Sequence, residues 1–457
     1  MNAALPMKKY HFILKSFLLV FFALAVSCQN DDEPVIYKEG STEYVNSWMY
    51  GQMKKYYLWS ENMPDRTNLS LDSKEYFKKL LQAEDRFSYA THLSSPETFP
   101  KSIRSTYGFD MAVIEHEGQF YGIVLFVLSD SPAERNGMKR GQLIKAINGT
   151  VFNSQNFESL YVALAHSDQA KLQVTEYASS SGFSAIKEIE ILRGFTFSQP
   201  ILHKLILNNT EKTGYLSIPH FDVGLASPLL QVFQDFKNQS VTKVIVDLRY
   251  NGGGDVSSAA ALSIILAPGS KPDDLFIKFK GNKNGGLVNK SFKEALEMNE
   301  TTVTYDALRA AHPAIQEVYV LCGSRTASAS EIIINNLKPF MKVITIGEKT
   351  VGKDVAGFAI EDTRISGQQG WVLYPAIYKL FNAADQGNYS MGITPSVTLN
   401  EIQNLEIFPL ADPREVLIQQ ALNGMSAAKK SSSSSVQVIP FKVNYNDADP
   451  LLKVNFN

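Results

Sequence analysis

The most constraining feature of this sequence is a run of small residues, Gly323-Ser-Arg-Thr-Ala-Ser-Ala-Ser-Glu331, between a predicted strand and a predicted helix. Residues 317–322 are largely β-branched, aromatic or aliphatic and end at a glycine, which is typical of a buried strand. Residues 331–337 carry three isoleucines and a leucine and predict a helix. A serine at this junction would lie beside unpaired backbone N–H groups, where the helix dipole favours negative charge. Such a serine suits acyl-transfer chemistry, but Ser and Thr also simply cap helices.

Two further stretches favour the chemical interpretation. Residues 244–250 predict a buried strand that leads into Asn251 and three consecutive glycines, 252–254. Glycines in series cost backbone entropy, so this turn requires unusual φ values or close backbone approach. Residues 342–347 predict another strand, and Gly352-Lys353 follows it. A lysine becomes a general base when burial keeps it neutral, and a serine–lysine pair needs no histidine.

These motifs, taken in order, resemble those of the C-terminal processing peptidases (tail-specific proteases), a family of serine–lysine endopeptidases. The family's Ser-Ala-Ser-Glu motif matches 328–331, its Gly-Lys motif matches 352–353, and its Asp-Leu-Arg-x-Asn-(Gly/Pro)-Gly motif matches 247–253. With a PDZ-like segment upstream, the resemblance covers roughly residues 106 to 400. It implies an α/β (α+β) multidomain fold, with a ClpP/crotonase-like α/β protease core, an upstream PDZ-like β-rich domain and an N-terminal helical segment.

The resemblance also assigns roles in peptide hydrolysis. It makes Ser328 the nucleophile, and Lys353, 25 positions later, the base that takes its proton and later returns it as an acid. It gives the oxyanion hole to the backbone N–H of Ala329, paired with that of Gly252 or Gly253. The mechanism implies no metal and no cofactor.

Other residues are alternatives for these roles. Ser330 and Lys349 are the nearest rivals, but the motif register and the 25-residue spacing favour Ser328 and Lys353. His220 follows a predicted strand, where an isolated histidine is usually structural. No Gly-x-Ser-x-Gly elbow of a histidine-dependent esterase occurs. Loss of either dyad residue would have indicated a non-catalytic, peptide-binding PDZ lipoprotein on a peptidase-like fold, and both residues are present.

Residues 106–196 change to short predicted strands. Residues 130–149 resemble the PDZ pattern Ser-Pro-Ala-(x)₃-Gly-(x)₃-Gly-Asp-x-Ile, with Gln142 in place of the aspartate. PDZ domains add an extended peptide as a strand and hold its terminal carboxylate with backbone amides. Tyr107, Gly108 and Phe109 occupy the place of that carboxylate loop, so we expect protein or peptide substrates with free C-termini. The alternative is a small β-domain without a ligand.

The N-terminus predicts export. Lysines flank an apolar run, 17–26, which is too short to span a bilayer comfortably. Ala25-Val-Ser-Cys28 resembles a bacterial lipoprotein cleavage site with lipidation at Cys28, and residues 29–34 resemble an acidic tether of Gram-negative outer-membrane lipoproteins. We therefore expect a lipid-anchored protein of the cell envelope, at the outer membrane. The alternatives are an ordinary secretory signal and an uncleaved anchor.

Composition limits the remaining possibilities. A chain of 457 residues with 44% hydrophobic and 20% charged residues can bury sizeable cores, and a net charge of −2 gives no reason to expect nucleic acid as a partner. With Cys28 acylated, Cys322 has no disulfide partner and is expected to be a buried apolar residue. The expected domains are 1–27 (lipoprotein signal peptide), 28–40 (acidic tether), 41–105 (helical segment), 106–196 (PDZ-like domain), 197–425 (peptidase core), 426–435 (serine-rich linker) and 436–457 (C-terminal tail).

One position departs from the family pattern. Many members carry a glutamine four residues after the lysine, which orients it, and here that position is Gly357. Asp354 is adjacent to the lysine, but a buried carboxylate touching Lys353 would favour the charged lysine, the wrong direction for a base. We therefore expect packing and a backbone carbonyl, or another polar group, to hold Lys353.

Overall fold

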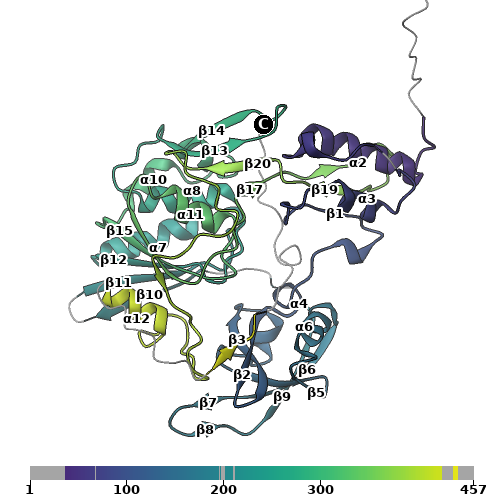
Figure 1. Ribbon diagram of the computed structural model, residues 1–457. Helices are drawn as coiled ribbons and strands as arrows, with labels where there is room; N and C mark the ends of the chain where they lie inside the picture. Colours follow the sequence, from purple (N-terminus) through teal and green to yellow (C-terminus); the bar gives the residue numbers. More distant parts are fainter. Residues whose placement is uncertain are drawn as a thin grey trace, which may run out of the picture.

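The computed structural model describes residues 36–440, except residues 67, 195, 197–200, 209–210 and 425–435. The predicted signal peptide with Cys28, most of the tether, the linker and residues 441–457 lie outside the described residues. Figure 1 shows three regions, namely N-terminal helices, an α/β core and a smaller β-rich domain. Within the described ranges, no helix is long and apolar enough to cross a membrane.

The core is built on a six-stranded sheet. Its order is β10 (Leu202–Asn208), β11 (Glu211–Ser217), β12 (Lys243–Asp247), β15 (Glu317–Cys322), β16 (Lys342–Gly347) and β21 (Val397–Thr398). The β10–β11 pair is antiparallel and every other pair is parallel. Strands β12 and β15 are apolar runs because both faces of a parallel sheet are buried. Both β15 and β16 coincide with the strands predicted from the sequence.

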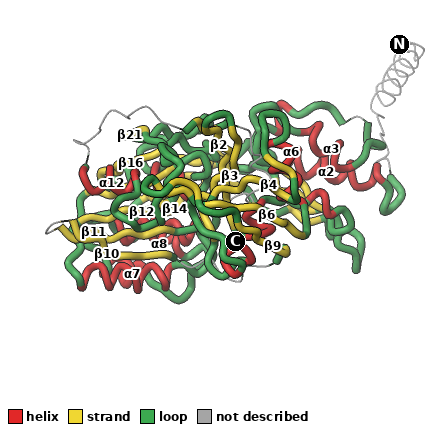
Figure 2. Tube along the Cα trace, turned by 90° about the horizontal axis from the view of Figure 1, so that it is seen from below, coloured by secondary structure: helices red, strands yellow, loops and turns green. Residues whose placement is uncertain are grey.

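Helices cover both faces of this sheet. One face packs against helices α7 to α11, and the other face packs against α12 (Val416–Asn423). Figure 2 shows α7 and α12 on opposite sides of β10 to β12. The first group is α7 (Ala226–Asn238), α8 (Val256–Leu266), α9 (Phe292–Leu296), α10 (Tyr305–Ala310) and α11 (Ala329–Asn336). Every residue of α8 and α11 is buried, so both helices lie inside the core.

The N-terminal region joins the core through a shared sheet. Helices α2 (Thr42–Tyr56) and α3 (Ser73–Leu80), with the short turns η1 (Ser60–Asn62) and η2 (Pro96–Thr98), precede or flank β1 (Tyr89–Thr91). Strand β1 pairs with β19 (Val372–Tyr374), which also pairs with β18 (Ile360–Glu361). A second antiparallel sheet contains β14 (Leu287–Ser291), β13 (Leu275–Lys280), β20 (Tyr378–Phe381) and β17 (Val355–Ala356).

The smaller β-rich domain, here called the small domain, spans residues 103–192. Its sheet contains β2 (Phe109–His116), β3 (Gln119–Val127), β4 (Leu143–Ile147), β6 (Gln169–Thr175) and β9 (Lys187–Leu192), with β5 (Thr150–Val151) beside β4. Its helices are α4 (Ile103–Tyr107), α5 (Pro132–Arg135) and α6 (Phe157–His166). A separate hairpin pairs β7 (Tyr177–Ala178) with β8 (Gly182–Phe183).

Two details of the small domain bear on the edge expected to bind a peptide. The sequence from Tyr107 to Val113 predicts a strand, but the observed β2 starts only at Phe109, because Tyr107 ends α4 and Gly108 caps that helix at φ +86°. The tail also contributes β22 (Gln437–Val438), which extends the sheet beyond β2. The described part of the C-terminal tail therefore contacts the small domain.

Candidate active site

Ser328 lies at the turn between β15 and α11 in a strained backbone conformation. Its φ is +57° and its ψ is −117°, outside the regions that a residue with a side chain usually adopts. Such conformations cost about 1–3 kcal/mol and concentrate at functional sites. Its buried Oγ has no hydrogen-bond partner in the described part of the chain. A serine present only to cap the helix would use this oxygen to accept a backbone N–H.

Ser330, the alternative nucleophile, uses its hydroxyl in a structural hydrogen bond. Its Oγ donates to the carbonyl oxygen of Asn251 at 3.1 Å, inside the buried α11. The backbone N–H of Ala327 donates to the same carbonyl at 3.1 Å. The two bonds hold the start of α11 against the residue that precedes the three glycines.

The glycine turn touches the serine directly. A Cβ added to Gly253 would lie 2.6 Å from the Cβ of Ser328 and 3.1 Å from its Oγ. Gly253 has φ +120°, a value that side chains rarely allow. The sequence predicted that these glycines allow close backbone approach or unusual φ values, and Gly253 shows both.

The backbone donors of this turn differ in availability. The N–H of Gly253 donates to Oδ1 of Asn251 at 2.8 Å. The N–H groups of Gly252 and Ala329 have no acceptor among the described residues. Ala329 is the first residue of α11, so its N–H belongs to the unpaired group at the helix N-terminus. Of the three predicted oxyanion-hole donors, Gly252 and Ala329 are therefore available to a ligand oxygen and Gly253 is not.

Glu331 connects the serine turn to the lysine segment. The fully buried carboxylate accepts the backbone N–H of Ser328 at 2.9 Å and that of Lys353 at 2.7 Å. It also accepts the N–H of Gly352 at 2.7 Å and the hydroxyl of Thr350 at 2.5 Å. Burial raises the pKa of Glu331 to about 7, while these donors act in the opposite direction. The sequence motif contained Glu331, but sequence reasoning gave it no role.

Lys353 is buried beneath the N-terminal region. Its side chain is 4% exposed, and its Nζ lies 5.7 Å from the ring centroid of Phe87. Phe87 belongs to a buried cluster with Ala327 and Val351. The neighbouring Arg86 donates to the carbonyl oxygen of Val351 at 2.9 Å. No local pattern in the sequence indicated that residues 86 and 87 would cover the lysine.

Asp354 and Gly357, the two positions not expected to orient Lys353, have other contacts in the structure. The carboxylate of Asp354 pairs with Nζ of Lys379, at 2.7 and 2.8 Å. A Cβ on Gly357 would lie 2.1 Å from the carbonyl oxygen of Pro375, so a side chain does not fit there. Lys353 precedes β17 and does not itself lie in a strand.

The other rival residues lie in different settings. Lys349 is exposed. The Nδ1 of His220 lies 2.9 Å from Oδ1 of Asp222, and Ser328 Oγ accepts no bond from it. Burial raises the pKa of the Cys322 thiol to about 12, so this sulfur stays protonated and is not a thiolate nucleophile.

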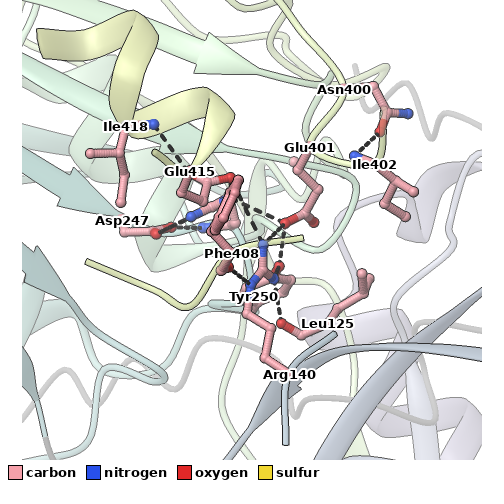
Figure 3. Close-up of polar contacts among 12 residues, drawn as sticks. Leu125, Arg140, Asp247, Tyr250, Asn400, Glu401, Ile402, Phe408, Glu415 and Ile418 are labelled. Atoms are coloured by element: carbon pink, nitrogen blue, oxygen red, sulfur yellow. Dashed lines mark hydrogen bonds and ion pairs between the residues drawn. The ribbon is translucent and has the colours of Figure 1, made fainter. Parts of the chain in front are cut away.

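A buried ion cluster lies behind the glycine turn, and Figure 3 shows it. Arg249 forms a bidentate pair with Asp247, from Nε to Oδ1 and from Nη2 to Oδ2, and also reaches Glu415 at 2.8 Å. Arg140 of the small domain reaches Glu401 at 3.0 Å, and Arg249 reaches the same carboxylate at 3.1 Å. Burial alone would raise the pKa of Glu401, but the two arginines bring it below its ordinary value. The Asp-Leu-Arg motif therefore anchors the turn and joins it to the small domain.

Tyr107, Gly108 and Phe109, which were expected to bind a substrate carboxylate, make most of their contacts within the small domain. Tyr107 and Phe109 are fully buried, and the hydroxyl of Tyr107 donates to the carbonyl oxygen of Ser167 at 2.7 Å. The N–H of Gly108 donates to the carbonyl oxygen of Arg104 at 2.8 Å. The role of these three residues stays a prediction.

Comparison with known proteins identifies the family. Residues 212–399 match the model of peptidase family S41, and residues 44–89 match the peptidase S41 N-terminal domain, together about half of the chain. The "Probable CtpA-like serine protease" of Staphylococcus aureus is 23% identical over 375 residues, which are 76% of this chain and 68% of that protein. The "Carboxyl-terminal-processing peptidase 3, chloroplastic" of Arabidopsis thaliana is 25% identical over 282 residues, and this chain spans about half of its length.

A solved structure agrees with the family match. The crystal structure of an S41 protease from Bacteroides fragilis superposes with a TM-score of 0.67 and 25% identity, covering 84% of this chain and 98% of that one. The chain belongs to peptidase family S41 and is a serine-type endopeptidase.

Proposed function

We propose that the protein hydrolyses peptide bonds of cell-envelope or extracellular proteins through an acyl-enzyme formed on Ser328. Neutral Lys353 takes the proton of Ser328 Oγ as that oxygen attacks the substrate carbonyl carbon. Lys353 then gives the proton to the leaving amine, and water hydrolyses the ester by the same route. The carbonyl oxygen becomes negative at each attack, and the N–H groups of Gly252 and Ala329 stabilise it. Gly253 supports this arrangement by allowing the turn to approach the serine.

The observation that carries the proposal is the position of Glu331. One buried carboxylate binds the backbone of both Ser328 and Lys353, so the two segments are held in a fixed relation. Fixed relative placement of nucleophile and base supplies much of the rate enhancement in such a pair. The strained, unpartnered Ser328 supports the same assignment.

The test is to incubate the protein from residue 29 onward with an unfolded protein substrate and to map the cuts by mass spectrometry. Ser328→Ala and Lys353→Ala are expected to abolish cutting while circular dichroism stays unchanged. Ser330→Ala and Lys349→Ala are the matched controls, and both are expected to retain substantial activity. Full activity of purified Lys353→Ala would overturn the serine–lysine assignment.

We also propose that the small domain acts as a PDZ-like module that selects substrates by a free, apolar C-terminus. The peptide would pair with β2 on the edge away from β3, which β22 occupies in the structure. Amidating the carboxylate of a good substrate is expected to raise KM more than it lowers kcat, because this contact is remote from the reacting bond. Equal kinetics for free and amidated substrates would remove this role.

The proposed location is the cell envelope, with acylated Cys28 as the first residue of the mature protein. Intact-mass analysis of detergent-extracted protein tests this. The expected mass corresponds to residues 28–457 plus a lipid moiety. A mature protein that starts elsewhere and carries no lipid would contradict it.

A further inference from the structure

The C-terminal tail occupies the open edge of β2 in the small domain. Strand β22 pairs antiparallel with β2, with Val438 opposite Ile114 and Gln437 opposite Glu115. The N–H of Ile439 donates to the carbonyl oxygen of Val113 at 2.9 Å. The other edge of β2 pairs with β3, so the tail covers the edge to which an incoming peptide would add.

The direction of the tail matches that of the ligand proposed above. Because the pairing is antiparallel, the tail runs from Glu115 towards the start of β2 and therefore towards Gly108. A substrate whose C-terminus ended at that loop would run the same way along the same edge. Pro440 fits this position because alternate residues of an antiparallel ladder turn their N–H away from the partner strand. Its missing N–H therefore costs no bond to β2.

The tail side chains alternate between two apolar surroundings. Val436 is 5% exposed and packs in a cluster that combines Tyr121 of the small domain with Ile402 of the core. Ile439 packs against the hydrophobic core of the small domain, which also contains Leu164 of α6. Val438 lines a cavity together with Arg325. The tail thus uses both its backbone and its apolar side chains, as a bound peptide would.

The covered edge also lies beside the serine turn. Arg325, three residues before Ser328, donates to the carbonyl oxygen of Met111 in β2 at 2.7 Å. A peptide on β2 is therefore close to the loop that carries the nucleophile. Whatever occupies this edge is positioned to influence access to the catalytic segment.

We propose that residues 436–440 are a tethered pseudo-ligand, which substrate C-termini must displace from β2 before they are held there. This inference rests on the proposed peptide-binding role of the small domain. The paired strand is two residues long, so its contacts are few, but its covalent attachment to the same chain gives it a high effective concentration, on the order of millimolar for a short connection. The tail therefore weakens the binding of substrates without preventing it.

The test measures peptide binding separately from proteolysis, in the Ser328→Ala background. The probe is a fluorescein-labelled, unstructured decapeptide that ends in Ala-Val with a free carboxylate, and its affinity is measured by fluorescence anisotropy. A chain that ends at residue 424 is expected to bind it at least about ten-fold more tightly than the full chain. An end-blocked peptide of residues 434–441, added in trans, is expected to displace the probe from the shortened chain.

Point variants keep the test independent of the truncation. Ile439→Asp in the full chain places a charge against the apolar core and is expected to bind the probe as tightly as the shortened chain. Gln437→Ser changes an exposed side chain of the same strand without adding a charge opposite Glu115, and is expected to bind like wild type. Equal affinities of wild type, Ile439→Asp and the shortened chain would overturn the proposal. So would a tail peptide that binds the shortened chain without displacing the probe, because the tail would then be only a structural strand.

The amidated probe separates this inference from the proposed recognition of free C-termini. If free and amidated probes bind equally, and both bind more tightly without the tail, recognition of the carboxylate fails but competition at the β2 edge is supported. If the free probe binds more tightly than the amidated one and removal of the tail changes neither affinity, recognition stands and the tail proposal fails.

Discussion

The carboxylate of Glu331 accepts the backbone N–H of Lys353 at 2.7 Å. Glu331 is also one turn of α11 beyond Ser328, whose N–H it accepts at 2.9 Å. The side chain therefore fixes the proposed base relative to the proposed nucleophile without touching the reacting atoms. Such a carboxylate is a positioning residue, and its removal should affect the rate of the chemical step more than substrate binding.

Glu331→Gln is expected to lower kcat by about 100-fold with a much smaller change in KM, because small displacements of reacting groups carry losses of that order. The amide nitrogen would face N–H groups that require an acceptor. Steady-state kinetics on a peptide substrate measures the effect. Glu317→Gln, in β15 and half-exposed, is the control and should retain wild-type kinetics. A Glu331→Gln enzyme with unchanged kcat would show that this carboxylate does not position the pair.

Glu331 should also make stability depend on pH. Its pKa is raised from 4.5 to about 7, so the folded state binds this proton more tightly than the unfolded state does. Its contribution is therefore fully present below pH 4.5 and is lost as the pH rises through about 7, by about 3 kcal/mol in total. Urea unfolding at pH 5 and pH 8 measures this. The wild type should lose stability relative to Glu331→Gln over that interval, and a constant difference would contradict the assignment.

Gly253→Ala is expected to reduce activity at least about 100-fold and stability by about 1–3 kcal/mol. The new Cβ would lie 2.6 Å from that of Ser328 and would have to adopt φ +120°. Gly224→Ala is a control for backbone strain alone, because Gly224 has φ +85° but open space around its Cβ position. Activity assays and thermal melts of both variants separate the two effects. Similar activity in both variants would mean that contact with Ser328 is unimportant.

Asp354→Asn is expected to change kcat by less than about three-fold. Its carboxylate binds Lys379 and not the catalytic segment, and an asparagine oxygen can still accept a bond from that ammonium group. Kinetics alongside a thermal melt would separate activity from stability. Near-complete loss of activity in a folded Asp354→Asn protein would mean that Asp354 does support Lys353.

Activity is expected to rise with pH, since a base must be neutral to accept a proton, with an apparent midpoint below that of free lysine. Phe87→Ala would admit water above Lys353 and should move the midpoint of the kcat/KM profile to higher pH. Phe87→Leu keeps an apolar cover and should remain close to wild type. A flat wild-type profile, or one midpoint shared by all three proteins, would contradict this account.

The sequence by itself determined the local elements around the site. Strands β15 and β16 were predicted at their observed bounds because buried parallel strands are short apolar runs that end at glycines. The glycine turn was predicted because consecutive glycines have few uses other than unusual φ values and close contacts. The motifs, taken in order, indicated the family because each is a short stretch whose residues are required by the local backbone conformation or by the chemistry.

Only the tertiary structure decided which groups meet. The motif register favoured Ser328 over Ser330, but the strained backbone of Ser328 and the buried hydrogen bond of Ser330 are visible only in the folded chain. Phe87 packs against Lys353, which is distant from it in the sequence. The tail pairs with β2, although most of the chain separates the two in sequence. Residue patterns report what each segment can form and which face it buries. They do not report which distant segment covers that face, because long-range contacts arise only when the whole chain has packed.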